Sequence, residues 1–444
     1  MTRATMIVLA VVLACTTGRA AAAATPAPQA PKPQGTSNLY GVFDHSVVRP
    51  ITRVTDPALG LRVLTHRRRE AVNVDAADQV RLPSTWWQPR LGYRPVSVER
   101  MLQGPGDATG PAPGPWTVTK AKSQGVSPGF QIEDAKGGKF IIKFDVPQFP
   151  GASTAADVIG SYLFWAAGYN VPENTIEHFR MDDLRIADDA KVTDTRGRSR
   201  PMTREFLAQL LARVTPPDGD GRYRCMASRY LTGKPLGPFR YAGRRADDPE
   251  DRVPHELRRE LRGLWTIAAW VNHADCRDAN SLDMWVTDHG RSFVRHYLID
   301  FGSTLGSTAT PIERDYSNGF EYYVDYGVMA KQTATLGMLR PKWFAVRDPN
   351  LPSIGFIESD VFDPAAWRPD YPNPAFDDRT ERDIRWGARI LAGFTDAHIR
   401  AAVGRGELPP DAADYLTRVL IARRDKLVQR WQPEDTATPQ RASE

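Results

Sequence analysis

Segment 272–302 of the 444-residue chain concentrates polar residues whose types could handle a phosphorylated ligand. Asn280 follows Asp275 by five positions, and a hydrophobic run then ends at Asp300-Phe301-Gly302. A carboxylate can orient an attacking hydroxyl and receive its proton. An amide and a second carboxylate supply the oxygen ligands that Mg²⁺ uses on nucleotide phosphates. The spacing therefore predicts phosphoryl transfer, with Asp275 at the hydroxyl and with Asn280 and Asp300 as metal ligands.

Two short runs rich in β-forming residues, 282–287 and 292–299, separate Asn280 from Asp300. The Asp288-His289-Gly290 sequence between the runs is typical of a hairpin turn. Because a hairpin places its flanking segments side by side, we expect Asn280 and Asp300 to lie close together. Shared metal ligation requires that proximity.

Upstream, the pattern indicates a small β-rich unit followed by a helix. Residues 139–143 read as a strand with its polar residues on one face. Before it lies a glycine-punctuated loop in which the backbone amides at Gly125 and Gly129 could approach phosphates. Residues 154–167 carry an apolar stripe at helical spacing. These elements would position the polar groups of segment 272–302.

Five features follow one another along the chain: a glycine loop, a strand lysine, an acidic helix, His273-Ala-Asp275 with Asn280, and Asp300-Phe301-Gly302. With these features in this order, the chain resembles the protein-kinase-like superfamily. It is most similar to the divergent bacterial branch of HipA-type, CotH-type and phosphoinositide-kinase-like proteins. Segments 153–174 and 415–428 resemble a group of exported bacterial proteins related to that superfamily. The kinase-specific resemblance covers residues 116–305.

The resemblance implies a site that binds a nucleotide, ATP, together with Mg²⁺. Lys143 would neutralise the leaving phosphates, and Asp157 would be its acidic partner. Arg277 would steady the transferring phosphate. Gly125 and Gly129 would complete the nucleotide-binding set.

Three features depart from the pattern of eukaryotic protein kinases. Asp157 stands where they carry the longer glutamate, and loop 122–129 is not a regular G-x-G-x-x-G. No A-P-E segment follows Asp300-Phe301-Gly302. Thr154 followed three positions later by Asp157 also fits a helix-capping arrangement, which is the alternative interpretation of this carboxylate.

The fold class predicted from these elements is α+β, a two-lobed protein-kinase-like fold with a β-rich N-lobe and a mainly helical C-lobe. The expected C-lobe helices include 255–271, 381–394, 395–403 and 411–431. The expected divisions are a signal peptide at 1–24, a disordered Ala/Pro linker at 25–38, an N-terminal extension at 39–115 that packs on the N-lobe, the N-lobe at 116–230, the C-lobe at 231–431 and a tail at 432–444.

The N-terminus predicts export. Arg3 precedes an apolar run at 6–13 that is too short to cross a bilayer. Cleavage before Cys15 would leave a lipid anchor in the membrane, and the small residues at 20–24 offer ordinary cleavage instead. The expected location is the periplasm or cell envelope, or outside the cell.

Composition adds limits on partners and redox chemistry. The 58 basic and 53 acidic residues leave a net charge of +5, which does not indicate a nucleic-acid partner. The basic cluster at 65–69 reads as a solvated patch. Cys225 and Cys276 follow the predicted signal, and whether they pair stays open.

The predicted function is transfer of the ATP γ-phosphate to a hydroxyl acceptor, which could be a protein, a lipid headgroup, a sugar or another small molecule. One alternative is a catalytically silent kinase-like envelope protein that binds a ligand or partner, because little ATP is expected outside the cytoplasm. A second is nucleotidyl transfer on the same fold. A serine hydrolase is disfavoured: Gly125-Val-Ser127-Pro-Gly129 matches its nucleophile pattern, but β-like residues follow where that motif needs a helix.

Overall fold

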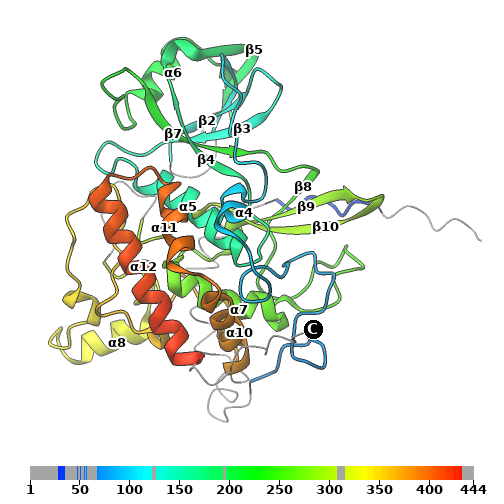
Figure 1. Cartoon of the computed structure of the whole chain (residues 1–444), viewed down its shortest axis with the longest axis vertical. Helices are drawn as coiled ribbons and strands as arrows, with labels where there is room; N and C mark the ends of the chain where they lie inside the picture. The colour runs from blue at the N-terminus through cyan, green and yellow to red at the C-terminus, as the bar shows by residue number, and fades with distance from the viewer. Residues whose placement is uncertain are drawn as a thin grey trace, which may run out of the picture.

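The computed structural model of the chain describes residues 29–35, 48, 51, 55, 57, 68–122, 127–193, 197–307 and 316–432. A β-rich lobe lies above a mainly helical lobe (Figure 1), which confirms the predicted two-lobed α+β fold. The predicted signal peptide, Cys15 and all of the tail except residue 432 lie outside the described residues. Among the helices within these ranges, none combines the length and apolar character needed to cross a membrane.

A seven-stranded sheet forms the N-lobe, with the strands in the order β4-β7-β3-β2-β1-β5-β6. Alternation along β3 turns Phe140 and Ile142 into the lobe's core, so Lys143 leaves the sheet on the opposite face. Helix α6 (Arg204–Leu211) packs Leu207 and Leu211 against the same core. The strands are β1 (Trp116–Ala121), β2 (Gly129–Glu133), β3 (Lys139–Lys143), β4 (Asn174–Phe179), β5 (Leu184–Thr193), β6 (Ser199–Pro201) and β7 (Tyr223–Arg229).

Helix α5 (Ala152–Ala166) lies below the sheet and is buried along almost its whole length. The first backbone amides of α5 are capped by a residue that precedes the helix. Oδ1 of Asp145 accepts hydrogen bonds from the backbone N–H groups of Ser153 and Thr154 at 2.9 Å each. The Thr154 hydroxyl donates to Oδ2 of the same Asp145 at 2.6 Å. The capping alternative for Asp157 is therefore wrong, and its carboxylate is left for another role.

The C-lobe surrounds helix α7, every residue of which is buried. Its predicted start at residue 255 is four residues early, because a separate 3₁₀ turn at His255–Leu257 precedes the helix. A three-stranded sheet in the order β10-β9-β8 projects beside it in Figure 1. The elements are α4 (Val98–Gln103), α7 (Arg259–Val271), α8 (Tyr326–Ala334), α9 (Pro374–Asp377), α10 (Glu381–Ala392), α11 (Asp396–Gly404), α12 (Pro410–Trp431), β8 (Lys234–Gly237), β9 (Ser281–Asp288) and β10 (Arg291–Leu298).

The described part of the N-terminal extension contacts the C-lobe as well as the N-lobe. The indole N–H of Trp87 donates to the carbonyl of Ala167 at 2.8 Å, and its ring lies 5.1 Å from that of Trp386 in the C-lobe. The backbone N–H of Ala112 donates to Asp134, in the turn between β2 and β3, at 2.8 Å. The extension therefore ties the lobes together.

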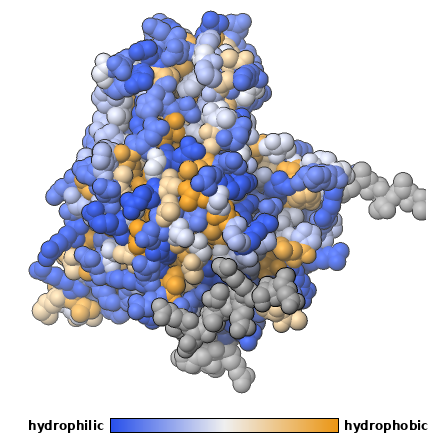
Figure 2. All heavy atoms as spheres, viewed as in Figure 1, coloured by the Kyte–Doolittle hydropathy of each residue, from blue (hydrophilic) through white to orange (hydrophobic). Residues whose placement is uncertain are grey.

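Cys225 and Cys276 are both free and buried, in the cores of different lobes. Burial raises the pKa of each thiol. Figure 2 shows that hydrophilic residues cover most of this face of the molecule, with hydrophobic residues gathered near its centre.

Candidate active site between the lobes

The β9–β10 hairpin brings Asn280 and Asp300 to its open end, as predicted. Ser281 pairs with Leu298, and the next backbone N–H, that of Ile299, donates to the carbonyl of Asn280 at 3.0 Å. Asp300 then adopts a left-handed conformation with φ 60° and ψ 70°. Aspartate tolerates this region better than most residues because its short polar side chain can bond locally.

Lys143 joins two carboxylates that are remote from it in the sequence. Its Nζ lies 2.8 Å from Oδ2 of Asp157 in α5 and 2.8 Å from Oδ1 of Asp300. The side chain of Asp157 is 3% exposed, whereas that of Asp300 is 49% exposed. Burial opposes the charge on Lys143, but the two carboxylates outweigh it and raise its pKa. Lys143 in turn lowers the pKa of Asp300 to about 2.

The remaining oxygen of Asp157 is also occupied. Its Oδ1 accepts the backbone N–H of Phe301 at 3.0 Å and the amide of Asn174 at 3.1 Å. Burial pushes the pKa of Asp157 up, against the pull of Lys143. Asp157 thus links α5 to both the lysine strand and the segment that carries Asp300.

Packing of Phe301 fixes the direction of Asp300. The Phe301 ring stacks on Phe164 with centroids 4.9 Å apart. A Cβ on Gly160 would lie 2.7 Å from the Cβ of Phe301, so only glycine there allows this approach to the helix. His273 lies beside the same ring and contacts the hydroxyl of Thr304 at 2.8 Å. Burial lowers the pKa of His273 to about 4, so this neutral side chain braces the loop.

Asp275, Arg277 and Asn280 form a second polar group just before the hairpin. Nε of Arg277 lies 2.7 Å from Oδ1 of Asp275, and its Nη2 donates to Oδ2 at 3.3 Å. The Asn280 amide N–H donates to the Asp275 carbonyl at 2.9 Å, which leaves its side-chain oxygen for a ligand. Burial raises the pKa of Asp275 to about 6, against the effect of Arg277. Arg277, expected at the transferring phosphate, contacts the predicted base here.

The predicted glycine loop is described only in part. Gly125 lies outside the described residues, while Gly129 starts β2 and pairs with Lys143. A Cβ at Gly129 would meet the carbonyl oxygen of Ile142 at 2.1 Å, so strand packing already accounts for this glycine. Ser127 is followed, after Pro128, by strand β2 and by no helix, so the interpretation of this motif as a hydrolase nucleophile elbow is wrong.

Sequence reasoning missed two residues at the site, Lys122 and Asn174. Nζ of Lys122 donates to the carbonyl of Ser127 at 2.9 Å. Burial and the nearby charge of Lys143 lower the pKa of Lys122 to about 8. Asn174 stood in a segment that carried the family resemblance, but no local pattern indicated that it would hold Asp157. Both depend on contacts that no local sequence pattern indicated.

The structure thus brings Lys143, Asp157 and Asp300 into direct contact and places Asp275 with Arg277 and Asn280 in a neighbouring group. Within the described ranges, no group of three or more His, Cys, Asp or Glu residues could hold a metal ion. One carboxylate and one amide oxygen nevertheless fit Mg²⁺, which commonly keeps waters and takes its other ligands from substrate phosphates.

No protein-family model matches the chain, and no curated protein matches it either. Solved structures that resemble it include the proinflammatory kinase CtkA of Helicobacter pylori, with a TM-score of 0.36 and 11% identity over 70% of this chain and 94% of that one. The Golgi casein kinase with Mn and ADP bound has a TM-score of 0.34 and 8% identity over 76% of this chain and 77% of its own. Another structure of the Golgi casein kinase has a TM-score of 0.34 and 8% identity over 91% of this chain and 93% of its own. Because these three TM-scores are below 0.5, the likenesses add no weight to the chemistry of the site.

Proposed function

We propose that the chain is a kinase-like phosphotransferase that moves the γ-phosphate of ATP to a hydroxyl acceptor with Mg²⁺. The observation that carries this proposal is Lys143, shared at 2.8 Å by a buried carboxylate, Asp157, and a half-exposed one, Asp300. A lysine that is held in place by a buried carboxylate and that also contacts an accessible carboxylate is suited to bind nucleotide phosphates next to their metal ion.

Each residue then has a proposed role. Asp157 orients Lys143, and Lys143 neutralises the leaving phosphates. Asn280 and Asp300 would hold Mg²⁺, which when bound would offset the charge of the nucleotide phosphates. Gly125 and Gly129 would let backbone amides approach the phosphates.

Asp275 would orient the acceptor hydroxyl and take its proton. Its pKa of about 6 leaves it ionised near neutral pH but close enough to accept a proton readily. Exchange of the Arg277 guanidinium from Asp275 to a phosphate oxygen would free this carboxylate and steady the transferring group. The acceptor class stays open among proteins, lipid headgroups, sugars and other small molecules. Export to the envelope or beyond, with or without a lipid anchor at Cys15, is part of the proposal.

The thermal stability of the purified protein with ATP, with and without Mg²⁺, tests the nucleotide site. At a ligand concentration about 100 times the dissociation constant, binding should add about 2.7 kcal/mol to the free energy of unfolding. The metal-dependent shift should disappear in Asp300→Asn. Asp288→Asn is the matched control, because it makes the same chemical change at the far end of the same hairpin.

A well-folded sample that shows no shift with any nucleotide would favour the alternative of a silent ligand-binding protein. Position-specific labelling separates the two transfer reactions. Phosphoryl transfer moves the label of γ-labelled ATP to the acceptor. Transfer of the label from α-labelled ATP would instead identify nucleotidyl transfer.

A further inference from the structure

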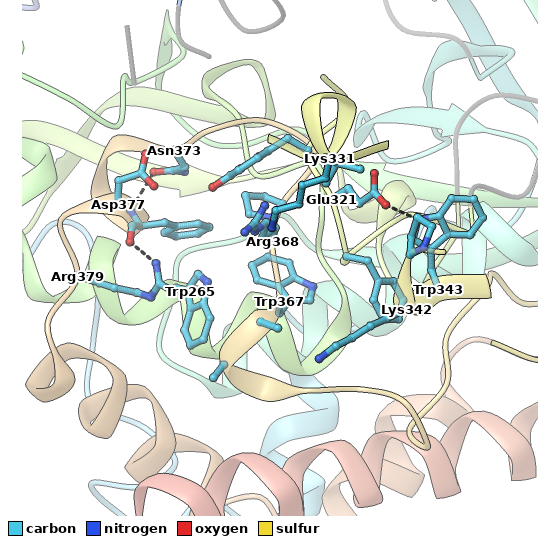
Figure 3. A pocket seen from close by; sticks show the side chains of 18 of the residues that line it. Trp265, Glu321, Lys331, Lys342, Trp343, Trp367, Arg368, Asn373, Asp377 and Arg379 are labelled. Atoms are coloured by element: carbon cyan, nitrogen blue, oxygen red, sulfur yellow. Dashed lines mark hydrogen bonds between the residues drawn. The ribbon is translucent and has the colours of Figure 1, made fainter. Parts of the chain in front are cut away.

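A cavity lies in the C-lobe, between the segment around α8 and residues 365–379. It has a volume of about 580 Å³, which is within the range of small-molecule sites. Figure 3 shows Trp265 and Trp367 among the side chains that line it, with cations from several segments around them. Phe320, Tyr322 and Trp343, which are partly exposed, line the cavity together with the buried rings of Trp265 and Trp367, so the cavity has an aromatic wall.

The cavity carries excess positive charge. Six basic residues line it against two acidic ones. Arg368 pairs with Asp325 at 2.6 Å, but Lys331 and Arg340 form no ion pair with another described residue. Segment 326–347, which supplies part of the wall, contains four basic residues and neither Asp nor Glu. An anion would therefore find unneutralised cations next to aromatic rings.

Two residues of the cavity wall also hold the loop that carries Asp275. The indole N–H of Trp367 donates to Oδ1 of Asn272 at 2.8 Å. The amide of Asn373 donates to the carbonyl of Cys276 at 3.1 Å. The wall is thus bonded to the loop on both sides of Asp275.

We propose that this cavity binds a small organic anion with an aromatic or apolar body, and that its occupancy steadies the loop of Asp275. The aromatic wall would take the body of the ligand, while Lys331 and Arg340 would take its charge. The inference goes beyond the proposed phosphotransferase, because binding here requires neither ATP nor Mg²⁺. Steadying of the loop would couple the two sites reciprocally.

Titration with 8-anilinonaphthalene-1-sulfonate, a fluorescent aromatic anion, tests the site on the purified protein without nucleotide. We expect saturable binding at one site, with quenching of tryptophan fluorescence. Ala366→Trp should abolish this binding by filling the cavity from its exposed rim. Arg340→Glu should weaken binding by at least about ten-fold, because it reverses one of the proposed ligand charges.

Two control variants make the same changes elsewhere. Ala208→Trp alters an exposed alanine of α6 in the other lobe, and Arg347→Glu alters a cation of the same segment that does not line the cavity. Both should bind the probe as the parent protein does. Non-saturable binding, or undiminished binding in Ala366→Trp, would overturn the site.

Hydrogen exchange tests the coupling separately. The probe should slow amide exchange at residues 273–277 in the parent protein and leave it unchanged in Ala366→Trp. Bound probe with unaltered exchange in this loop would overturn the coupling. Because no nucleotide is present, neither result depends on whether the chain transfers phosphate.

Discussion

Asp383 in the C-lobe and Asp300 between the lobes are both carboxylates with basic partners, but their surroundings differ. Asp383 is fully buried, with Arg259 at 2.8 Å, Arg262 at 3.3 Å and the backbone N–H of Thr380 at 2.7 Å. Asp300 is half exposed, and one of its oxygens contacts Lys143. Its other oxygen has no hydrogen-bond partner among the described residues.

The comparison separates charge that holds the fold from charge available to a ligand. A buried carboxylate surrounded by basic groups is not accessible to a ligand, and its removal leaves the buried guanidinium groups with one counter-charge fewer. A half-exposed carboxylate can be lost at little cost to the fold, yet it can still ligate a metal. Substitution of Asp383 should therefore lower stability, whereas substitution of Asp300 should lower metal binding with little loss of stability.

The largest expected effect is the loss of stability in Asp383→Asn. The change leaves Arg259 and Arg262 buried with one counter-charge fewer, which should lower the free energy of unfolding by about 3–5 kcal/mol. Urea denaturation followed by tryptophan fluorescence measures this loss. A loss below about 1 kcal/mol would remove the contrast with Asp300.

The next effect compares two carboxylates that share one lysine. Asp157→Asn should cost about 1–3 kcal/mol of stability, because its buried oxygens accept hydrogen bonds from Phe301 and Asn174 as well as contacting Lys143. Asp300→Asn should cost only about 0–1 kcal/mol, because its side chain is half exposed. The same denaturation experiment without nucleotide measures both. Equal losses would mean that Asp300 is as structural as Asp157.

A smaller effect is expected from pH. Proton transfer to Asp275 requires the ionised form, and its pKa is about 6. The value of kcat/KM should therefore fall with decreasing pH below about 6, by about ten-fold per pH unit, equivalent to about 1.4 kcal/mol. His273 and Asp300, with pKa values of about 4 and about 2, keep their charge states through most of this window.

The pH profile of phosphate transfer between pH 5 and 8 checks this prediction. Arg277→Gln supplies the internal test, because Arg277 holds the pKa of Asp275 down. Its removal should move the acid limb of the profile to higher pH. A profile that stays flat below pH 6 would exclude Asp275 as the base.

The smallest effect is expected at a surface ion pair. Arg291 lies 2.7 Å from Glu250, but their side chains are 56% and 49% exposed. Arg291→Ala should change the free energy of unfolding by about 0–1 kcal/mol, because water screens the pair. Urea denaturation of this variant and of Asp383→Asn in the same experiment measures the smallest and the largest expected losses in the free energy of unfolding. A loss comparable to that of Asp383→Asn would show that burial does not set the energies of these pairs.

The sequence by itself determined the local elements and the order of the polar groups. The alternation at 282–287 and 292–299 and the Asp288-His289-Gly290 turn predicted the hairpin, and the hairpin was confirmed with Asn280 and Asp300 at its open end. Such predictions succeed because hydrophobic periodicity and turn residues act over a few neighbouring positions.

Only the tertiary structure decided which charges meet. Lys143 and Asp300 are 157 residues apart, and their contact depends on Phe301 packing against Gly160 of α5. The same holds for the cap at Asp145 and for the extension that contacts both lobes. Ion pairing and burial depend on the relative placement of whole elements, which packing determines and spacing along the chain does not encode.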